Sequence, residues 1–387
     1  MEEINGIHYW KYKAQSSFDT GYGDLNKNVL SKYTKEQFDS LNEEGQKDLI
    51  NEVFNIVRER NIFPGVYYYT EKDIIEEIQY CKEKELPQFN GEVLDKRPTL
   101  GNSMLKFLFP NYFLVKCKED KNNSLYERWL DDHKLKRAIE FCFKFRPKIK
   151  TPLTSNYIYQ AFEMIGGNIP TNFLPMKAKM LLEYYLPNGG NYLDFSCGFG
   201  GRLLGAMTTK KKINYYGFEP NSETYEHLLE LSHFINEALS ISVNDDRMKI
   251  YKQGSECKLP AEIVGNMDFA FSSPPYFNLE KYSDEDTQCY VRFSKLEEWI
   301  TNYVEKTIQN LYCALKPNAY YAVNISDFKV GNENIKFVDE WIKISENSGF
   351  ELVKEIPTKI GRSRPNSQSN QQVYVPKIES IYLFKKL

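Results

Sequence analysis

The stretch from Met267 to Phe277 constrains the fold of this chain more than any other part of the sequence. It begins with a short apolar run, too brief for a helix, which predicts a buried strand. The run then meets Pro274 and Pro275, which fix their own backbone φ angles and lack the amide hydrogen that a strand uses. The strand must therefore end in a stiff loop, and open α/β sheets bind ligands at the carboxyl ends of their strands.

The loop that follows this strand, Ser273-Pro274-Pro275-Tyr276, has a distinct chemistry. Because proline donates no hydrogen bond, the carbonyl groups here stay available as acceptors beside the Ser273 hydroxyl. Tyr276 adds an aromatic ring. Acceptors grouped near an aromatic face suit a planar amino group, such as the exocyclic nitrogen of a nucleobase. A proline-rich turn with a core tyrosine would have the same sequence.

A second motif, Asp194-x-x-x-Gly198-x-Gly200-Gly201, lies between a predicted strand and a predicted helix. Glycines at such a point let the backbone approach a ligand closely and present the first amides of the helix to it. The acid Glu219 ends the next predicted strand, about 20 positions further on, where a carboxylate can accept hydrogen bonds from two ribose hydroxyls. The same geometry serves a dinucleotide or an adenosyl group.

From about Thr151 the sequence alternates between apolar runs typical of strands and amphipathic segments typical of helices. Strands are predicted at 192–195, 215–219, 248–251, 267–272, 319–325, 350–356 and 378–384. Helices are predicted at 175–185, 202–207, 224–238, 296–315 and 337–348. This order predicts an α/β fold with a doubly wound, Rossmann-like sheet of seven strands.

Residues 1–150 have a different pattern, which predicts a mixed and mostly helical N-terminal domain beside a second domain at 151–387. Basic residues gather between Lys134 and Lys150, with three phenylalanines among them. This pattern fits a surface that contacts phosphates, with phenylalanines between the basic residues, although a run of charge more often forms a solvated helix face.

The composition excludes several classes of protein. A net charge of −3 over 387 residues argues against a surface that binds nucleic acid over most of its area. A local basic patch is still compatible with this net charge. The seven cysteines form no Cys-x-x-Cys pair and the four histidines have no metal-ligand spacing, so we expect no metal site and a reducing, cytoplasmic compartment. The first residues show no signal peptide, and no apolar stretch approaches the roughly 20 residues of a membrane span.

Three segments together resemble the motifs of S-adenosylmethionine-dependent amino-methyltransferases that act on DNA. They are Asp194-Phe195-Ser196-Cys197-Gly198-Phe199-Gly200, Glu219-Pro220-Asn221 and Ser273-Pro274-Pro275-Tyr276. In that family the glycine loop holds the methionine part of the cofactor, the acid holds its ribose, and the tetrapeptide holds the amino group of adenine or cytosine. The resemblance covers roughly residues 170–387 and implies the seven-stranded methyltransferase sheet.

The resemblance also implies a role for each matching residue. The cofactor would be bound by Asp194, Ser196, Gly198, Gly200, Glu219, Pro220, Glu256 near its adenine ring and Lys177 near its methionine end, and the catalytic residues would be Ser273, Pro274, Pro275 and Tyr276. The tail at 377–385 resembles the closing strand of the family. Family members often have Pro and Phe where this chain has Phe195 and Ser196, and a serine that opens the tetrapeptide is commoner among cytosine N4 enzymes than adenine N6 enzymes.

The expected chemistry follows from the poor nucleophilicity of an exocyclic base amine, whose lone pair is delocalised into the ring. Hydrogen bonds to Ser273 and to the Pro274 carbonyl would favour a pyramidal nitrogen, while stacking on Tyr276 would orient the base. The target atom lies inside a duplex, so the base is expected to be flipped out. In-line transfer needs no metal and no covalent intermediate, so Cys197 and Cys257 are interpreted as packing residues.

Two loops near the tetrapeptide carry further expectations. The acidic segment 278–294 is a poor phosphate binder and is interpreted as a lid. The segment 361–372 is rich in Arg, Asn and Gln, so we expect Arg362 and Arg364 to contact DNA, unless the segment is a disordered loop. Phe277 is predicted to line the pocket of the flipped base, and packing in the core is the alternative.

Three functions remain open at this stage. The first is a DNA methyltransferase whose specificity comes from residues 1–150 and the late loop, alone or with a restriction or specificity partner. The second keeps the chemistry but methylates a guanine amine in RNA or a glutamine amide in a protein. The third is a non-catalytic nucleic-acid-binding subunit, against which the intact Gly198, Gly200, Glu219 and tetrapeptide argue. The serine and the closing strand favour DNA.

Overall fold

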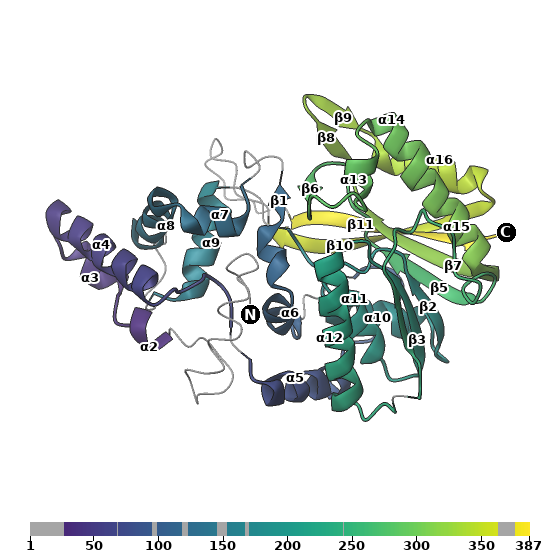
Figure 1. Cartoon of the computed structure of the whole chain (residues 1–387), viewed down its shortest axis with the longest axis horizontal. Coiled ribbons are helices and arrows are strands. Elements are labelled where there is room, and N and C mark those ends of the chain that lie inside the picture. Colours follow the sequence, from purple (N-terminus) through teal and green to yellow (C-terminus); the bar gives the residue numbers. More distant parts are fainter. Residues whose placement is uncertain are drawn as a thin grey trace. The chain divides into compact units, whose positions relative to one another are not determined.

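The computed structural model describes residues 27–67, 69–94, 99–117, 123–144, 153–166, 170–242, 244–362 and 376–387. The chain divides into two compact units, whose elements are labelled in Figure 1. A helical unit contains residues up to Ile74, Lys106–Thr171 and Glu280–Ser283; a sheet unit contains Ile75–Leu105, Asn172–Leu279 and Asp284–Leu387. The expected boundary near residue 150 thus falls inside the helical unit, and residues 75–105 group with the sheet.

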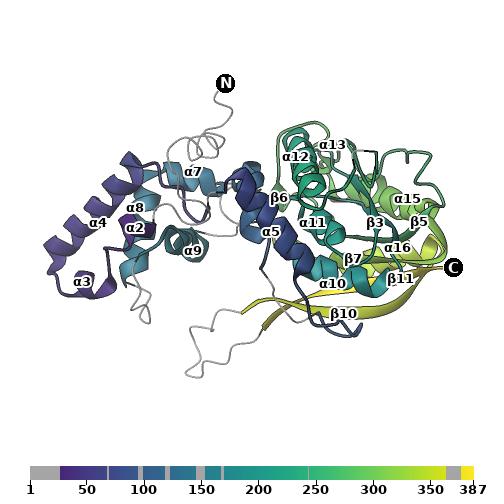
Figure 2. The same ribbon diagram turned by 90° about the horizontal axis from the view of Figure 1, so that it is seen from below.

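The sheet unit is built on one sheet of seven strands in the spatial order β10-β11-β7-β5-β2-β3-β4. The neighbours from β7 to β4 are parallel, whereas β11 runs antiparallel to both β7 and β10; Figure 2 shows the long β10 and β11 side by side. This confirms the predicted Rossmann-like, seven-stranded sheet. The strands are β2 (Gly190–Asp194), β3 (Ile213–Phe218), β4 (Met248–Tyr251), β5 (Met267–Ser272), β7 (Leu315–Ile325), β10 (Phe350–Arg362) and β11 (Pro376–Lys386).

Helices alternate with these strands along the chain, as the sequence predicts. They are α10 (Pro175–Tyr185), α11 (Gly201–Met207), α12 (Ser222–Ala238), α13 (Cys289–Arg292), α14 (Leu296–Trp299), α15 (Lys306–Ala314) and α16 (Phe337–Asn347). The single helix expected at 296–315 is wrong in one respect, because a π-helical turn, η3 (Ile300–Glu305), separates α14 from α15. A short hairpin of β8 (Phe328–Val330) and β9 (Glu333–Ile335), which was not expected, follows β7.

The central strand β5 explains the apolar run that precedes the two prolines. Phe269, Ala270 and Phe271 are all buried, because β5 pairs in parallel with β2 on one side and β7 on the other. A parallel strand covered on both faces has a nearly continuous run of apolar side chains. On one face Tyr185 of α10 stacks on Phe269 with ring centroids 5.0 Å apart. The prediction of a buried strand ending at the prolines is confirmed.

The helical unit is mostly α-helical within its described residues, as expected for the N-terminal part. It contains α2 (Lys27–Leu30), α3 (Lys35–Asp39), α4 (Glu43–Glu59), the 3₁₀ helix η1 (Pro110–Leu114), α7 (Leu125–Leu130), α8 (Asp132–Lys144), α9 (Ser155–Gly166), and a two-residue pairing of β1 (Lys116–Cys117) with β6 (Glu280–Lys281). The helices α5 (Glu71–Glu83) and α6 (Asn102–Leu108) include residues of both units.

An aromatic cluster forms the core of the helical unit. Phe63 packs edge-on against Phe113 and Trp129, with ring centroids 5.0 and 5.3 Å apart. The Trp129 indole donates a hydrogen bond to the Ile62 carbonyl oxygen at 3.0 Å, so its one polar atom is satisfied. Aromatic pairs of this kind stabilise a core beyond the area that they bury.

The basic run of this unit lies largely on α8. Lys144 pairs with Glu140 at 2.6 Å, Lys134 pairs with Asp131 at 3.5 Å, and the Lys136 ammonium lies 4.5 Å from the centre of the Phe54 ring. These contacts are those of a solvated helix face. Residues 145–150, the rest of the run, lie outside the described residues. A phosphate-binding role for the run stays a prediction.

Two searches of the described residues bear on the expected class of protein. None of the helices there is long and apolar enough to cross a membrane. In the same residues, no group of three or more His, Cys, Asp or Glu side chains is arranged to hold a metal ion. The seven cysteines are all free thiols, and five of them are buried.

One buried cation ties α5 to the sheet unit, and its removal should weaken the fold. Lys179 of α10 is 1% exposed, and its ammonium group donates to the carbonyl oxygens of Cys81, Lys82 and Lys84 at 2.8, 3.0 and 3.2 Å. We predict that Lys179→Met lowers the free energy of unfolding by about 2–3 kcal/mol, because three carbonyls lose their donor and that of Cys81 is buried. Urea unfolding of the variant measures this, with the exposed Lys211→Met as the matched control; an equal midpoint for both variants would contradict it.

Candidate active site

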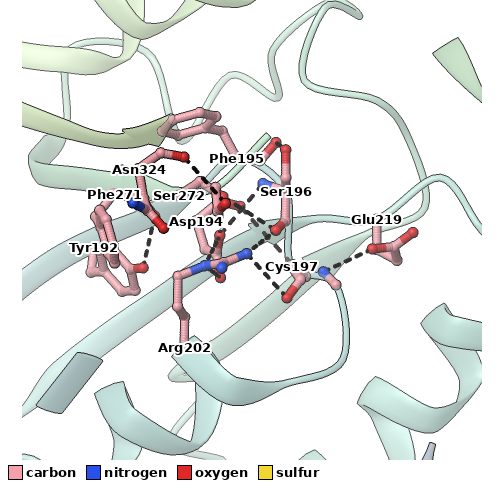
Figure 3. Close-up of polar contacts among 12 residues, drawn as sticks. Tyr192, Asp194, Phe195, Ser196, Cys197, Arg202, Glu219, Phe271, Ser272 and Asn324 are labelled. Atoms are coloured by element: carbon pink, nitrogen blue, oxygen red, sulfur yellow. Dashed lines mark hydrogen bonds and ion pairs between the residues drawn. The ribbon is translucent and has the colours of Figure 1, made fainter. Parts of the chain in front are cut away.

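Asp194, the last residue of β2, is fully buried beneath the glycine-rich loop. Its carboxylate accepts hydrogen bonds from Arg202 Nε at 2.9 and 3.0 Å and from the Ser272 hydroxyl at 2.8 Å (Figure 3). It also accepts from the Tyr215 hydroxyl at 2.9 Å. Both carboxylate oxygens are therefore engaged by the protein. Asp194 supports the loop from below, and its direct contact with a cofactor stays a prediction.

Arg202, in the first turn of α11, connects Asp194 to the backbone of the loop. The side chain is buried, and its guanidinium also donates to the carbonyl oxygens of Ser196 and Cys197 (Figure 3). Burial lowers the pKa of Arg202, but the charge of Asp194 outweighs this and raises the pKa above its usual value. Arg202 is therefore a permanent cation that fixes the path of residues 196–197.

Ser272, the last residue of β5, joins the glycine loop to the proline loop. Its hydroxyl donates to Asp194 Oδ1 at 2.8 Å and lies 3.2 Å from the Ser196 carbonyl oxygen. Because β2 and β5 are parallel neighbours, both loops leave the sheet at the same edge. The predicted cofactor motif and the predicted catalytic motif are thus brought together, and one buried carboxylate is shared between them.

The glycine loop has the backbone shape that the sequence predicts. Gly198 and Gly200 have φ angles of 55° and 71°, in the left-handed region that glycine adopts without strain. A Cβ atom added to Gly198 would meet no other atom within 4 Å, so this side of the loop is open. The Gly198 amide donates to Glu219 Oε2 at 3.0 Å, which links the loop to the end of β3 (Figure 3).

Glu219 follows β3 directly and is 7% exposed. Its other oxygen, Oε1, accepts from the Asn221 amide at 2.9 Å. Burial raises the pKa of Glu219 to about 7, although the two backbone amides oppose the shift. Each oxygen retains a lone pair beyond the one that its amide uses, so the carboxylate can still accept from two hydroxyl groups.

Glu256 lies in the loop after β4 and is 9% exposed. Its Oε1 pairs with Arg292 at 2.5 Å, whereas its buried Oε2 has no hydrogen-bond partner among the described residues. A Cβ atom on Gly254 would lie 2.1 Å from Oε2, so only glycine leaves room for this carboxylate. The open glycine loop, the Glu219 carboxylate and the Glu256 Oε2 acceptor are groups of the kind that can hold an adenosyl group.

The proline loop places Ser273 and Tyr276 beside β7 and the β8–β9 hairpin. The Ser273 hydroxyl donates to the Asn324 carbonyl oxygen at 3.2 Å. The Tyr276 ring packs edge-on against Phe328 and Phe337, with centroids 5.8 and 6.0 Å apart. These contacts fix both side chains from behind. Pro274 is buried and Pro275 is half-buried in the same loop.

Three further predicted residues have contacts of a structural kind. Phe277 is buried with its ring 5.8 Å from that of Trp299, and its φ of 39° is unusual for a residue with a side chain. The Lys177 ammonium is buried and donates to Thr358 Oγ1 at 2.7 Å. The Pro220 carbonyl accepts from Thr287. Base contact by Phe277 and cofactor contact by Lys177 and Pro220 stay predictions.

The late loop is described only in part. Strand β10 extends to Arg362, so the backbone of the first two residues of the expected loop, Gly361 and Arg362, belongs to the sheet. Arg364 lies outside the described residues. The expected DNA contacts of Arg362 and Arg364 therefore stay predictions.

Four residues that adjoin the predicted motifs were not predicted from the sequence: Arg202, Tyr215, Ser272 and Tyr303. Each of the first three is a polar residue at an inward position of an otherwise apolar segment, and Arg202 is the only charged residue of α11. That pattern could have marked them. Tyr303 lies in the π-helical turn near Ser196 and Ser255; burial raises its pKa, although those two hydroxyls lower it. Burial likewise raises the pKa of Cys197, which fits a packing role.

The sheet order, with one antiparallel strand next to the edge, and the loops at its carboxyl edge define the Rossmann-like fold of S-adenosylmethionine-dependent methyltransferases. Over 174 residues the chain is 25% identical to the Type II beta methyltransferase M.BslI of Bacillus sp. (strain NEB-606), a match that covers 41% of this chain and 17% of that protein. The chain thus spans less than a fifth of the length of that relative. No protein-family model matches the chain.

Solved structures with similarity to the chain include two from thermophilic bacteria. TrmN from Thermus thermophilus is 14% identical, with a TM-score of 0.33 over 61% of this chain and 55% of that one. An S-adenosylmethionine-dependent O-methyltransferase from Thermotoga maritima is 13% identical, with a TM-score of 0.34 over 56% of this chain and 68% of that one. Likenesses at this level carry no argument about substrate.

The ion pair between Asp194 and Arg202 should be essential to stability. We predict that Arg202→Met lowers the free energy of unfolding by about 3–5 kcal/mol, because it leaves a buried carboxylate without its cation. The double variant Asp194→Asn/Arg202→Met removes both charges and should be less destabilised than the single one. Urea unfolding measures these two variants and the single variant Asp194→Asn, with the exposed Arg60→Met as control. A double variant as unstable as the sum of the two single changes would contradict the pairing.

Proposed function

We propose that this protein transfers a methyl group from S-adenosylmethionine to an exocyclic amino group of a DNA base. The observation that carries the proposal is the shared support of the two loops: Ser272 and Ser196 join at Asp194, so the cofactor loop and the Ser-Pro-Pro-Tyr loop form one site. A chain that bound a dinucleotide would have no use for a rigid cluster of acceptors at this place.

The described residues suit each part of the cofactor. The open face of Gly198 would admit the methionine end, the Glu219 carboxylate would accept from the ribose hydroxyls, and Glu256 Oε2 would accept from the adenine amino group. When bound, the cofactor supplies an electrophilic methyl group on a sulfonium. No metal is required for this transfer.

The proline loop would orient the amino group that is methylated. The Ser273 hydroxyl already donates its one hydrogen to Asn324, so its lone pairs can only accept, and they would accept from an amino N–H. Tyr276, held from behind by Phe328 and Phe337, would stack on the base. A nitrogen held by Ser273 and Tyr276 would be placed to accept the methyl group that the cofactor supplies when bound, and an amino proton would leave to water.

The choice of DNA as substrate has separate support. The tetrapeptide opens with serine, as in amino-methyltransferases that act on cytosine, and the curated protein that matches this chain is named as a Type II methyltransferase. A base inside a duplex must be flipped out to reach Ser273, which costs a few kcal/mol. Arg362, Arg364 and the helical unit are proposed to contact the DNA, with or without a restriction or specificity partner.

A transfer assay tests the substrate directly. Tritiated S-adenosylmethionine is incubated with duplex DNA of mixed sequence, with RNA and with protein, and the labelled products are analysed. We expect label in N4-methylcytosine or N6-methyladenine. Label only in a guanine of RNA or a glutamine of protein would move the proposal to those substrates, and no label with cofactor bound would favour the non-catalytic subunit.

The Glu219 carboxyl makes cofactor affinity depend on pH. Ribose hydroxyls donate to the ionised form, and the pKa is about 7, so the carboxyl is protonated below neutrality and ionised above it. We predict that the affinity for S-adenosylhomocysteine rises between about pH 6 and pH 8 and then levels off, as calorimetry at several pH values would show. Glu219→Gln should bind weakly with no such rise; the same rise in that variant would exclude Glu219 as its source.

The tetrapeptide should act in transfer and not in cofactor binding. We predict that Tyr276→Ala and Ser273→Ala each reduce the rate of methyl transfer by about 100-fold or more, because the base loses its orientation. The affinity for S-adenosylhomocysteine should stay within about threefold of wild type, since hydrogen bonds of the glycine loop are untouched. Tyr80→Ala, at an exposed tyrosine of the sheet unit, is the control. A retained transfer rate would remove these residues from the pocket.

A further inference from the structure

The segment that follows the proline loop, residues 284–292, is in contact with the loop after β3. The Glu285 carboxylate accepts from the Ser222 amide at 3.0 and 3.2 Å and from the Ser222 hydroxyl at 3.1 Å. The hydroxyl of Thr287 donates to the Pro220 carbonyl at 3.0 Å. We call residues 284–292 the α13 segment. One end of it is therefore fixed beside Glu219, the proposed ribose acceptor.

The other end of the α13 segment is fixed to the loop after β4. Arg292 pairs with Glu256 Oε1 at 2.5 Å, and Glu256 is almost wholly buried there. The α13 segment thus spans the two loops that would surround the purine half of the cofactor. Nothing in the sequence motifs points to this segment as part of the cofactor site, because it follows the tetrapeptide and not the glycine loop.

Two buried polar atoms at this place have no hydrogen-bond partner among the described residues. One is Glu256 Oε2, an acceptor, and the other is Gln288 Nε2, a donor. Gln288 is 5% exposed. Gln288 is the N-cap of α13, and the Arg292 amide donates to its carbonyl oxygen at 3.0 Å. Burial and the charge of Glu256 raise the pKa of Cys289, the residue after Gln288, so the start of α13 lies close to the Glu256 loop.

A buried polar atom without a protein partner costs free energy unless a ligand, an ion or a water satisfies it. Here an acceptor and a donor occur together, which matches one edge of adenine: its amino group donates, and the neighbouring ring nitrogen accepts. Hypoxanthine has the reverse pattern, with a carbonyl oxygen beside a ring N–H. The two free atoms therefore distinguish the two purines.

We propose that Gln288 is a specificity-determining residue that reads the purine of the cofactor together with Glu256. Its amide NH₂ donates to a ring nitrogen of adenine while Glu256 Oε2 accepts from the 6-amino group. The inference rests on the proposed function and deepens it, because it assigns the adenine-reading role to a side chain on the α13 segment. Cofactor binding would then order the chain directly after the proline loop.

Calorimetry with two products of the cofactor tests this without any methyl transfer. S-adenosylhomocysteine and S-inosylhomocysteine differ only at the purine edge. Wild type should prefer the adenosyl compound by about 100-fold, because both hydrogen bonds are mismatched in the other. Gln288→Leu should lose about tenfold in affinity for the adenosyl compound. Gln288→Glu should reduce the preference for the adenosyl compound more than Gln288→Leu does, because the new carboxylate accepts from the hypoxanthine N–H.

The matched control is Gln309→Leu, the same change at an exposed glutamine of α15 whose amide donates to Glu305 at the end of η3 at 3.1 Å. Its affinity for both compounds should equal that of wild type. Thermal unfolding separates recognition from a structural role. A glutamine that served the fold would destabilise the protein when changed to leucine, whereas Gln288→Leu should unfold at about the wild-type temperature or above, since it removes a buried amide nitrogen without a partner among the described residues.

The outcomes separate this inference from the proposed function. Wild-type affinity in Gln288→Leu would overturn the role of Gln288 while leaving the cofactor in place, and so would an equal loss for both compounds in Gln288→Glu and Gln288→Leu. A lower unfolding temperature together with unchanged preference would make Gln288 a structural residue. Failure of folded wild-type protein to bind either compound would instead overturn the proposed cofactor.

Discussion

The buried ion pair between Asp194 and Arg202 is the interaction on which the rest of the site depends. A carboxylate with no exposed surface is tolerated only if cations and hydrogen-bond donors surround it, and here Arg202, Tyr215 and Ser272 do so. These donors come from α11, β3 and β5. One charge therefore holds three elements in register at the carboxyl edge of the sheet, which is where both loops begin.

The consequence is that the two loops are rigid for different reasons. The glycine loop is held by side chains, because Arg202 binds its carbonyls and Glu219 binds the Gly198 amide. The proline loop is held by its own covalent structure, since two consecutive prolines restrict the backbone without any partner. A flexible ligand can then be bound against the first loop and a planar group placed against the second, with little rearrangement of either.

Much of this architecture was predictable because short local sequence patterns determine it. The alternation of strands and helices, the positive φ angles of Gly198 and Gly200, and the strand that ends at Pro274 all follow from short stretches of sequence. The π-helical turn at 300–305 was not predictable, since its residues also suit an ordinary helix and only the surrounding packing selects the longer turn. Arg202 and Gln288 were missed because their meaning comes from partners far along the chain.

The two acids of the site have similar sequence contexts, but their surroundings in the fold give them different roles. Asp194 and Glu219 both end a parallel strand and both are buried. Asp194 meets an arginine and two hydroxyls, so its charge is neutralised within the protein. Among the described residues Glu219 forms no salt bridge and accepts from two backbone amides; burial raises its pKa to about 7, although the amides and the charge of Arg202 oppose the shift. Glu219, which has no salt-bridge partner among the described residues, is therefore the acid that a ligand can stabilise, because each hydroxyl that donates to it favours the ionised form.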